Sequence, residues 1–124
     1  MAVSVLKQHK NLIATIQPGI TDAEWTQLQD DLLEKVGRHR STGVVIDVAG
    51  LDVMDSFAIR ILRTIAQACR MRGAETVLVG IQPEIAFMMV QLGWTARLEG
   101  INTALDLEDG LEFLARRDGR GLPR

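Results

Sequence analysis

The sequence predicts a single α/β domain with a mixed sheet whose central strands are parallel, in the order β-β-α-β-α-β-α-β-α. The length of 124 residues suits one domain. Two short segments of alternating apolar and polar residues open the chain around a polar turn, which is typical of a β-hairpin. After them, strand-length apolar runs alternate with longer segments of helical periodicity, which indicates parallel strands joined by helices.

The hairpin is predicted over residues 1–8 and 11–17, where apolar and polar side chains alternate. Pro18 and Gly19 stop its second strand. A helix is predicted to begin at Thr21, because T-D-A-E forms a capping box. Gly37 is predicted to end this helix. Its apolar face consists of Trp25, Leu28, Leu32, Leu33 and Val36.

The central β-α-β unit is predicted over residues 43–80. Its strands, 43–49 and 76–80, are rich in apolar and β-branched residues, as expected where both faces of a sheet are covered. The helix between them is predicted to begin at Ser56 and to stop at Gly73. Its buried stripe is predicted to hold Ala58, Ile61, Leu62, Ile65 and Cys69.

The last elements are a short helix from Pro83 to Gly93, a weak strand over 97–101 and a helix over 104–115. The domain is therefore predicted to span residues 1–115. The tail, 116–124, carries four arginines, two glycines and one proline, and we expect it to be disordered.

Composition excludes several classes of protein. The net charge of −2 gives no overall attraction to nucleic acid or to a membrane. The one cysteine, Cys69, cannot form an intramolecular disulfide, which fits a reducing compartment. The chain shows no signal-peptide run and no apolar segment long enough to span a bilayer. A cytoplasmic protein is predicted.

Ser56 is the first candidate functional residue, because it lies where a helix begins after an acidic turn. One interpretation is a helix N-cap, whose hydroxyl accepts a hydrogen bond from the backbone of the first turn. The other is a phosphorylation site, since backbone donors and the helix dipole stabilise an anion at that end. The two interpretations are compatible.

The carboxylates of Asp47, Asp52 and Asp55 form the second candidate. Such a group can bind Mg²⁺ or carry out acid–base chemistry, but an acidic turn exposed to water has the same pattern. The histidines, His9 and His39, lie in predicted loops with no ligand spacing. Neither a dinucleotide fingerprint nor a P-loop is present. We therefore expect no metal and no cofactor.

The helix beginning at Pro83 is apolar around most of its circumference, from Ile85 to Val90. A helix buried on most sides has this pattern, and so does a helix that presents an apolar patch to a protein partner. Phe87 and Met88 are adjacent and point about 100° apart, so we expect at most one to face the core. The other is predicted to contact a partner.

Three runs of the sequence resemble a known family. They are DVAGLDVMDSFAIRIL (47–62), TVLVGIQPEIAFMMVQLGW (76–94) and INTALDLEDGLEFL (101–114). They are similar to the STAS domain of anti-sigma-factor antagonists, and in particular to the single-domain, RsbS-like scaffold proteins of the bacterial stressosome. The D-S-F of 55–57 and the V-G-I-Q-P of 79–83 are specific when found together.

The resemblance implies the fold predicted above and places the family's phosphorylated serine on Ser56. It implies a switch serine kinase that modifies this residue, a phosphatase that reverses the change, and assembly with homologues that carry an N-terminal sensor domain. The scaffold holds the kinase and releases it when phosphorylated. The expected interface comprises Asp52, Asp55, Phe57, Phe87 and Met88.

Two alternatives remain open. One is a simple antagonist that binds an anti-sigma factor in a partner-switching pathway without building a large assembly. The other is a small Mg²⁺-dependent enzyme that uses Asp47, Asp52 and Asp55.

Overall fold

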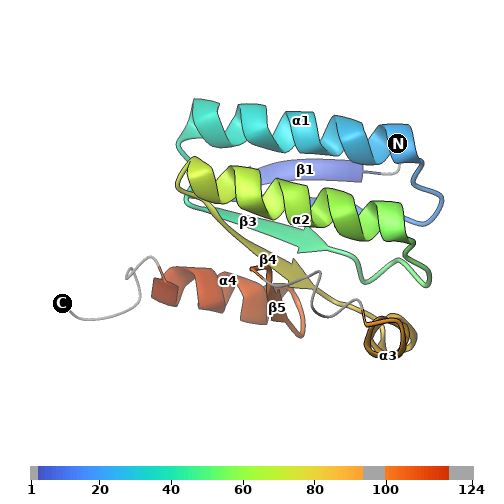
Figure 1. Ribbon diagram of the computed structural model, residues 1–124. Coiled ribbons are helices and arrows are strands. Elements are labelled where there is room, and N and C mark those ends of the chain that lie inside the picture. The colour runs from blue at the N-terminus through green and yellow to red at the C-terminus, as the bar shows by residue number, and fades with distance from the viewer. Residues whose placement is uncertain (1–2, 94–99, 118–124) are drawn as a thin grey trace.

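The predicted order of strands and helices is confirmed by the computed structural model, which describes residues 3–93 and 100–117 (Figure 1). One sheet contains the strands in the order β1-β2-β3-β4-β5. The first pair is antiparallel and the remaining pairs are parallel. The elements are β1 (Val3–Gln8), β2 (Asn11–Ile16), α1 (Asp22–His39), β3 (Gly43–Asp47), α2 (Ser56–Met71), β4 (Glu75–Val79), α3 (Pro83–Gln91), β5 (Asn102–Ala104) and α4 (Leu107–Arg117).

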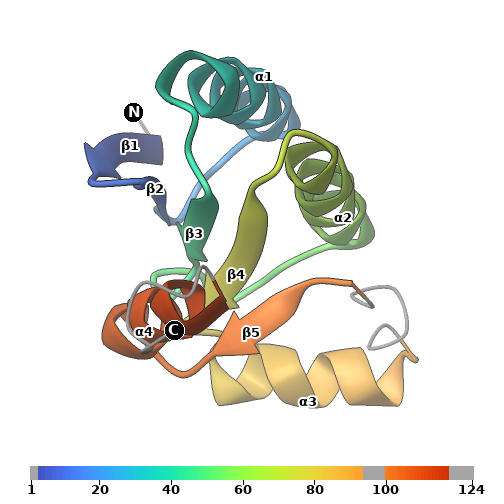
Figure 2. The same ribbon diagram turned by 90° about the vertical axis from the view of Figure 1, so that its left-hand side faces the viewer.

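The helices form layers on both faces of the sheet (Figure 2). α1 and α2 cover one face, where the larger apolar cluster includes Leu28, Leu62 and Leu78. α4 covers the other face, where Leu114 packs with Val45 and Val77. The central strands are therefore buried on both sides, which explains their continuous apolar runs.

The capping box at the start of α1 is confirmed. The hydroxyl of Thr21 accepts a hydrogen bond from the backbone N–H of Glu24 at 3.1 Å, and the Glu24 carboxylate accepts one from the backbone of Thr21 at 2.9 Å. The predicted end at Gly37 is wrong. The helix continues to His39, and Arg40 ends it in the left-handed conformation with φ of 51°. Glycine is tolerated inside a helix when contacts with other elements stabilise the helix. Near Gly37, the Arg72 guanidinium supplies such a contact by donating a hydrogen bond to the carbonyl of Leu33.

The boundaries near the C-terminal end differ from those predicted. β5 begins at Asn102, whereas the strand was predicted over 97–101, of which 97–99 lie outside the described residues. The last helix begins at Leu107 because Asp106 caps it, accepting a hydrogen bond from the backbone N–H of Asp109 at 2.9 Å. It continues to Arg117, two residues into the expected tail. Residues 118–124 lie outside the described part.

Within the described residues, no helix combines the length and the apolar character needed to cross a membrane.

Glu75 ties β4 to its neighbours at the start of the strand. Asn102 donates a hydrogen bond to its carboxylate at 2.8 Å, and Arg70 lies 3.3 Å from the same oxygen. Burial raises the pKa of Glu75, but these hydrogen bonds and the charges of Arg70 and Arg117 outweigh it, so that the pKa lies below its ordinary value.

We expect Glu75 to make the domain less stable in acid. The pKa of Glu75 is lower in the folded state than its ordinary value of 4.5. The ionised carboxylate therefore stabilises the fold fully at pH values above 4.5, and this contribution is lost as the pH falls through the folded-state pKa. Glu75→Gln should lower the free energy of unfolding at neutral pH by about 1 kcal/mol. Urea titrations at several pH values should show that the mutant loses less stability in acid than the parent does.

Candidate functional site

The segment between β3 and α2 presents the candidate residues at the carboxyl end of the sheet. Two apolar side chains hold it against the domain: Leu51 is 4% exposed and Met54 is 3% exposed. Between them, Asp52 and Val53 project into solvent, and Val53 is 71% exposed. We call this pair the knuckle. Its position is therefore determined by buried anchors on either side.

Asp55, and not Ser56, is the N-cap of α2. The Asp55 carboxylate accepts a hydrogen bond from the backbone N–H of Ala58 at 2.9 Å. The interpretation of Ser56 as the cap is therefore wrong by one residue, because aspartate and serine are both good caps and here the aspartate takes the position. Ser56 is the first helical residue and is exposed. Within the described part of the chain its hydroxyl makes no hydrogen bond.

The three candidate carboxylates do not form a metal centre. Asp47 accepts a hydrogen bond from the backbone N–H of Ala49 at 2.9 Å, and Asp55 serves as the cap. Among residues 3–93 and 100–117 there is no group of three or more acidic, histidine or cysteine side chains placed to hold a metal ion. His9 and His39 lie in the β1–β2 turn and the last turn of α1, at the opposite end of the domain from Ser56. The site therefore lacks a base for an enzyme of the serine-triad type.

A shallow pocket lies beside the site. It has a volume of about 80 Å³ and is lined by residues that include Trp25, Val53 and Asp55. Pockets that bind small molecules usually have volumes of about 300–1,000 Å³. The pocket is therefore smaller than the usual range for small-molecule sites.

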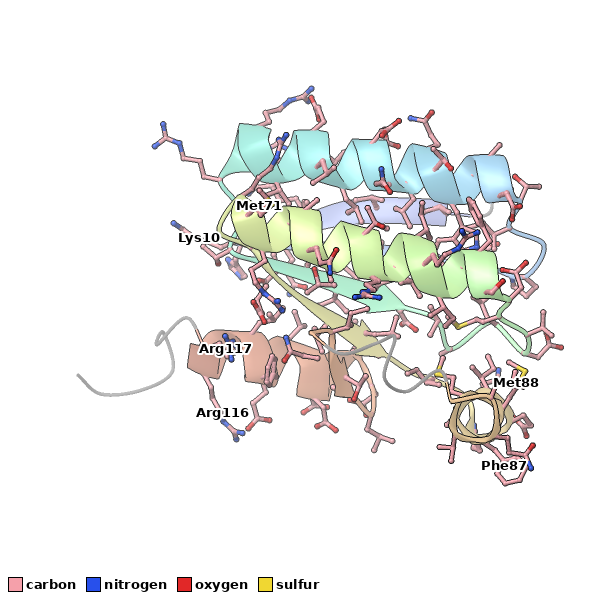
Figure 3. The ribbon with its side chains drawn as sticks, in the orientation of Figure 1. Lys10, Met71, Phe87, Met88, Arg116 and Arg117 are labelled. Atoms are coloured by element: carbon pink, nitrogen blue, oxygen red, sulfur yellow. The ribbon has the colours of Figure 1, made fainter. Side chains whose placement is uncertain are left out.

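α3 lies next to the same loop, and the side chain of Gln82 donates a hydrogen bond to the carbonyl of Ala49 at 2.8 Å. Neither Phe87 nor Met88 is fully buried. Met88 is half-buried on the side of α3 toward the loop, whereas Phe87 is 63% exposed and points away from the domain (Figure 3). The core contacts belong to Ile85 and Met89, one helical turn apart, which the sequence did not single out.

The side chain of Phe57 is neither fully buried nor fully exposed. Its ring packs against the edge of the larger apolar cluster and is half-buried. The guanidinium carbon of Arg60 lies 5.7 Å from the ring centroid, which is within the range of a cation–π contact. Phe57 thus supports the first turn of α2 and leaves part of its ring accessible beside Ser56.

Comparisons with known proteins agree on one family. A family model described as the STAS domain matches residues 2–110. The RsbT co-antagonist protein RsbRA of Bacillus subtilis is 35% identical over 106 residues, which cover 77% of this chain and 39% of that protein. A serine-to-glutamate variant of RsbS from Moorella thermoacetica superposes with a TM-score of 0.80 at 30% identity, over 95% of this chain and 98% of that one. A chain from a structure of the stressosome, described as a signal integration and transduction hub, gives a TM-score of 0.77 at 31% identity, over 93% and 98%.

Proposed function

The chain belongs to the STAS domain family, and from this membership we propose that it is a non-enzymatic scaffold subunit of a stressosome-type assembly in the cytoplasm. In this proposal the chain binds a switch serine kinase when Ser56 is unmodified and releases it when Ser56 is phosphorylated. A phosphatase resets the switch. The similarity to RsbS and to a stressosome chain, which extends over nearly the whole of each, supports the scaffold role. The similarity to RsbRA supports assembly with related STAS proteins.

The observation that carries the proposal is the placement of Ser56. Its hydroxyl is exposed on the first turn of α2, where the backbone N–H groups and the helix dipole favour a phosphate. Asp52 and Asp55 lie beside it in the sequence, so a phosphate adds charge to a surface that is already acidic. A partner docked there meets repulsion and a higher desolvation cost. The same modification can therefore form easily and still expel a partner.

The direct test is to mix the unmodified chain with a switch serine kinase from the same organism and to measure the complex by size-exclusion chromatography. We expect co-elution without ATP, and release of the kinase together with one phosphate on Ser56 after ATP is added. Mass spectrometry locates the phosphate. Failure of the kinase to bind the unmodified chain would refute the proposal.

The simple antagonist is distinguished by the size of the complex. A scaffold mixed with a sensor-domain homologue is expected to form a very large particle, whereas an antagonist forms a small complex with an anti-sigma factor. Light scattering coupled to chromatography separates the two outcomes.

The substitution Ser56→Asp is expected to keep the fold and weaken kinase binding. A negative charge at the first helical position is favourable to the helix dipole, so the free energy of unfolding should change by less than about 1 kcal/mol. The added charge nevertheless lies on the proposed docking surface. Thermal melts and a binding titration with the kinase measure the two effects, with Ser56→Asn as the uncharged control of similar size. A mutant that unfolds, or that binds the kinase as tightly as the parent, contradicts this expectation.

A further inference from the structure

Two turns at the end of the domain opposite Ser56 carry basic side chains at positions where glycine is usual. His9 lies in the β1–β2 turn with φ of 55°, and Arg40 ends α1 with φ of 51°. They are the only residues other than glycine with positive φ among those that the structure describes. This left-handed conformation costs free energy for any residue with a Cβ atom. A histidine and an arginine kept there against that cost indicate a role for their side chains.

These two turns lie side by side. The backbone N–H of Thr42, in the turn after α1, donates a hydrogen bond to the carbonyl of Lys10 at 2.8 Å. A third cation is held next to α1, because the Arg72 guanidinium donates to the carbonyl of Leu33 at 3.0 Å. The C-terminal ends of α1, α2 and α4 all lie on this side of the domain (Figure 1). We give the name basic face to the exposed side chains of His9, Lys10, Arg40 and Arg72.

The positive charge of the basic face is not neutralised within the described part of the chain. The carboxylates on the neighbouring elements are paired with other arginines: Glu34 with Arg38, Glu112 with Arg116, and Glu75 with Arg70 and Arg117. Lys10, Arg40 and Arg72 form no ion pair with the carboxylate of any described residue. Favourable interaction with helix C-termini explains Arg40 and Arg72, but not Lys10 in the hairpin turn. The net charge of −2 therefore conceals a local excess of positive charge.

An apolar side chain projects beside these cations. Met71, the last residue of α2, is 88% exposed, more than any other large apolar side chain that the structure describes. Figure 3 shows it at the same end of the domain as Lys10. Proteins that bind a membrane surface combine these two features, because cations attract anionic headgroups and apolar side chains enter the headgroup layer. Single-stranded nucleic acid is bound largely by stacking on aromatic rings, and the basic face contains no phenylalanine, tyrosine or tryptophan.

We infer that the basic face is a docking surface for a membrane with anionic headgroups, and that Met71 enters the headgroup layer. Its three unpaired cations are fewer than the about four to eight of typical lipid-binding clusters, so one copy binds weakly and reversibly. The sequence that follows α4 adds two arginines and one aspartate, which favours the same partner. A docked domain holds Ser56 at the end away from the membrane, so the two surfaces are separate. The inference does not rest on the proposed function.

The test is co-sedimentation with vesicles of phosphatidylserine and phosphatidylcholine in equal parts, compared with vesicles of phosphatidylcholine alone. The parent is expected to bind only the anionic vesicles. Raising the salt from about 0.1 M to about 1 M should release it, because the screening length falls from about 10 Å to about 3 Å. The double reversal Lys10→Glu with Arg40→Glu should weaken binding by roughly tenfold or more. The matched control, Arg60→Glu with Arg63→Glu, changes the net charge equally on the first half of α2 and should bind nearly as the parent does.

A second set of variants separates binding from folding. Glycine suits the left-handed conformation, so His9→Gly with Arg40→Gly should melt at or above the temperature of the parent and yet bind anionic vesicles less tightly. Met71→Ser should weaken binding severalfold, because an apolar side chain no longer enters the headgroup layer. Leu105→Ser removes a side chain that is 79% exposed between β5 and α4, and it should bind as the parent does.

Melting curves show which variants fold, and the glycine pair carries the test if the double reversal unfolds. A parent that does not bind anionic vesicles at low salt overturns the inference. So does equal binding to the two kinds of vesicle, or a loss of binding in the control as large as in the reversal. Binding to duplex DNA in place of vesicles, measured by fluorescence anisotropy, would assign the basic face to nucleic acid and also overturn it. If the parent and its variants bind vesicles as expected but a kinase neither binds the chain nor modifies Ser56, the membrane contact stands and the proposed function does not.

Discussion

Replacing Ser56 by alanine is expected to abolish kinase-dependent phosphorylation and to trap the kinase on the scaffold. The side chain is exposed and makes no hydrogen bond in the described part of the chain, and Asp55 supplies the cap of α2. Alanine is a good helix former, so the free energy of unfolding should change by less than about 0.5 kcal/mol. The kinase should bind Ser56→Ala as it binds the parent, and ATP should no longer release it.

The matched control is Thr64→Ala. Thr64 lies two turns further along α2, is also exposed, and uses its hydroxyl to donate to the carbonyl of Arg60 at 3.0 Å. Its removal should leave both phosphorylation and release unchanged. Mass spectrometry and a release assay give the two readouts. If Ser56→Ala is modified at the normal rate on Thr42 or Thr64, Ser56 is not the switch.

The sequence predicted where α2 begins but not which residue caps it. Asp55 and Ser56 are adjacent and both are favourable caps, so local preference does not choose between them. The choice depends on the loop before the helix, where Leu51 and Met54 are buried and set the path of the chain. This correction bears on the proposed function, because a serine that caps a helix shares its hydroxyl with the backbone, whereas the Ser56 hydroxyl makes no hydrogen bond with any described residue.

The end of α1 and the start of α4 show a similar limit. Glycine is a strong signal for a helix end, yet Gly37 lies inside α1 and Arg40 takes the left-handed conformation. The side chain of Arg72, more than thirty residues away, contacts the carbonyl of Leu33 in the same turn region. Asp106 caps α4 after a strand of only three residues, which is too short to produce a clear alternating pattern. A contact with a distant segment thus lies near the end of α1, whereas a local cap marks the start of α4.

The partner contact expected at α3 stays a prediction, but the structure shows which side chains of this helix are buried. The apolar run of α3 indicated that side chains on more than one face are apolar, and the structure shows two of them buried and others exposed. The buried face could not be chosen from the run itself, because most of its positions are equally apolar. Ile85 and Met89 face the larger apolar cluster, and the hydrogen bond from Gln82 to the carbonyl of Ala49 joins the start of α3 to the β3–α2 loop.

Substitutions on the buried face of α3 are expected to lower the stability of the domain, whereas substitutions on its exposed face should leave the stability nearly unchanged. Ile85 is 1% exposed, so Ile85→Ala should destabilise the domain by roughly 2–5 kcal/mol, as truncation of a core side chain does. Phe87 is 63% exposed and points away from the domain, so Phe87→Ser should change the free energy of unfolding by less than about 0.5 kcal/mol. Urea titrations measure both values.

Phe87→Ser should nevertheless reduce assembly with the kinase or with STAS homologues, because an exposed aromatic ring on a mostly apolar helix has the character of a contact residue. Leu105→Ser is the matched control, since Leu105 is 79% exposed but lies between β5 and α4. It should leave both stability and assembly unchanged. If Phe87→Ser assembles as fully as Leu105→Ser, the exposed face of α3 is not a partner surface. A loss of stability in Phe87→Ser comparable to that of Ile85→Ala would instead place the ring in the core.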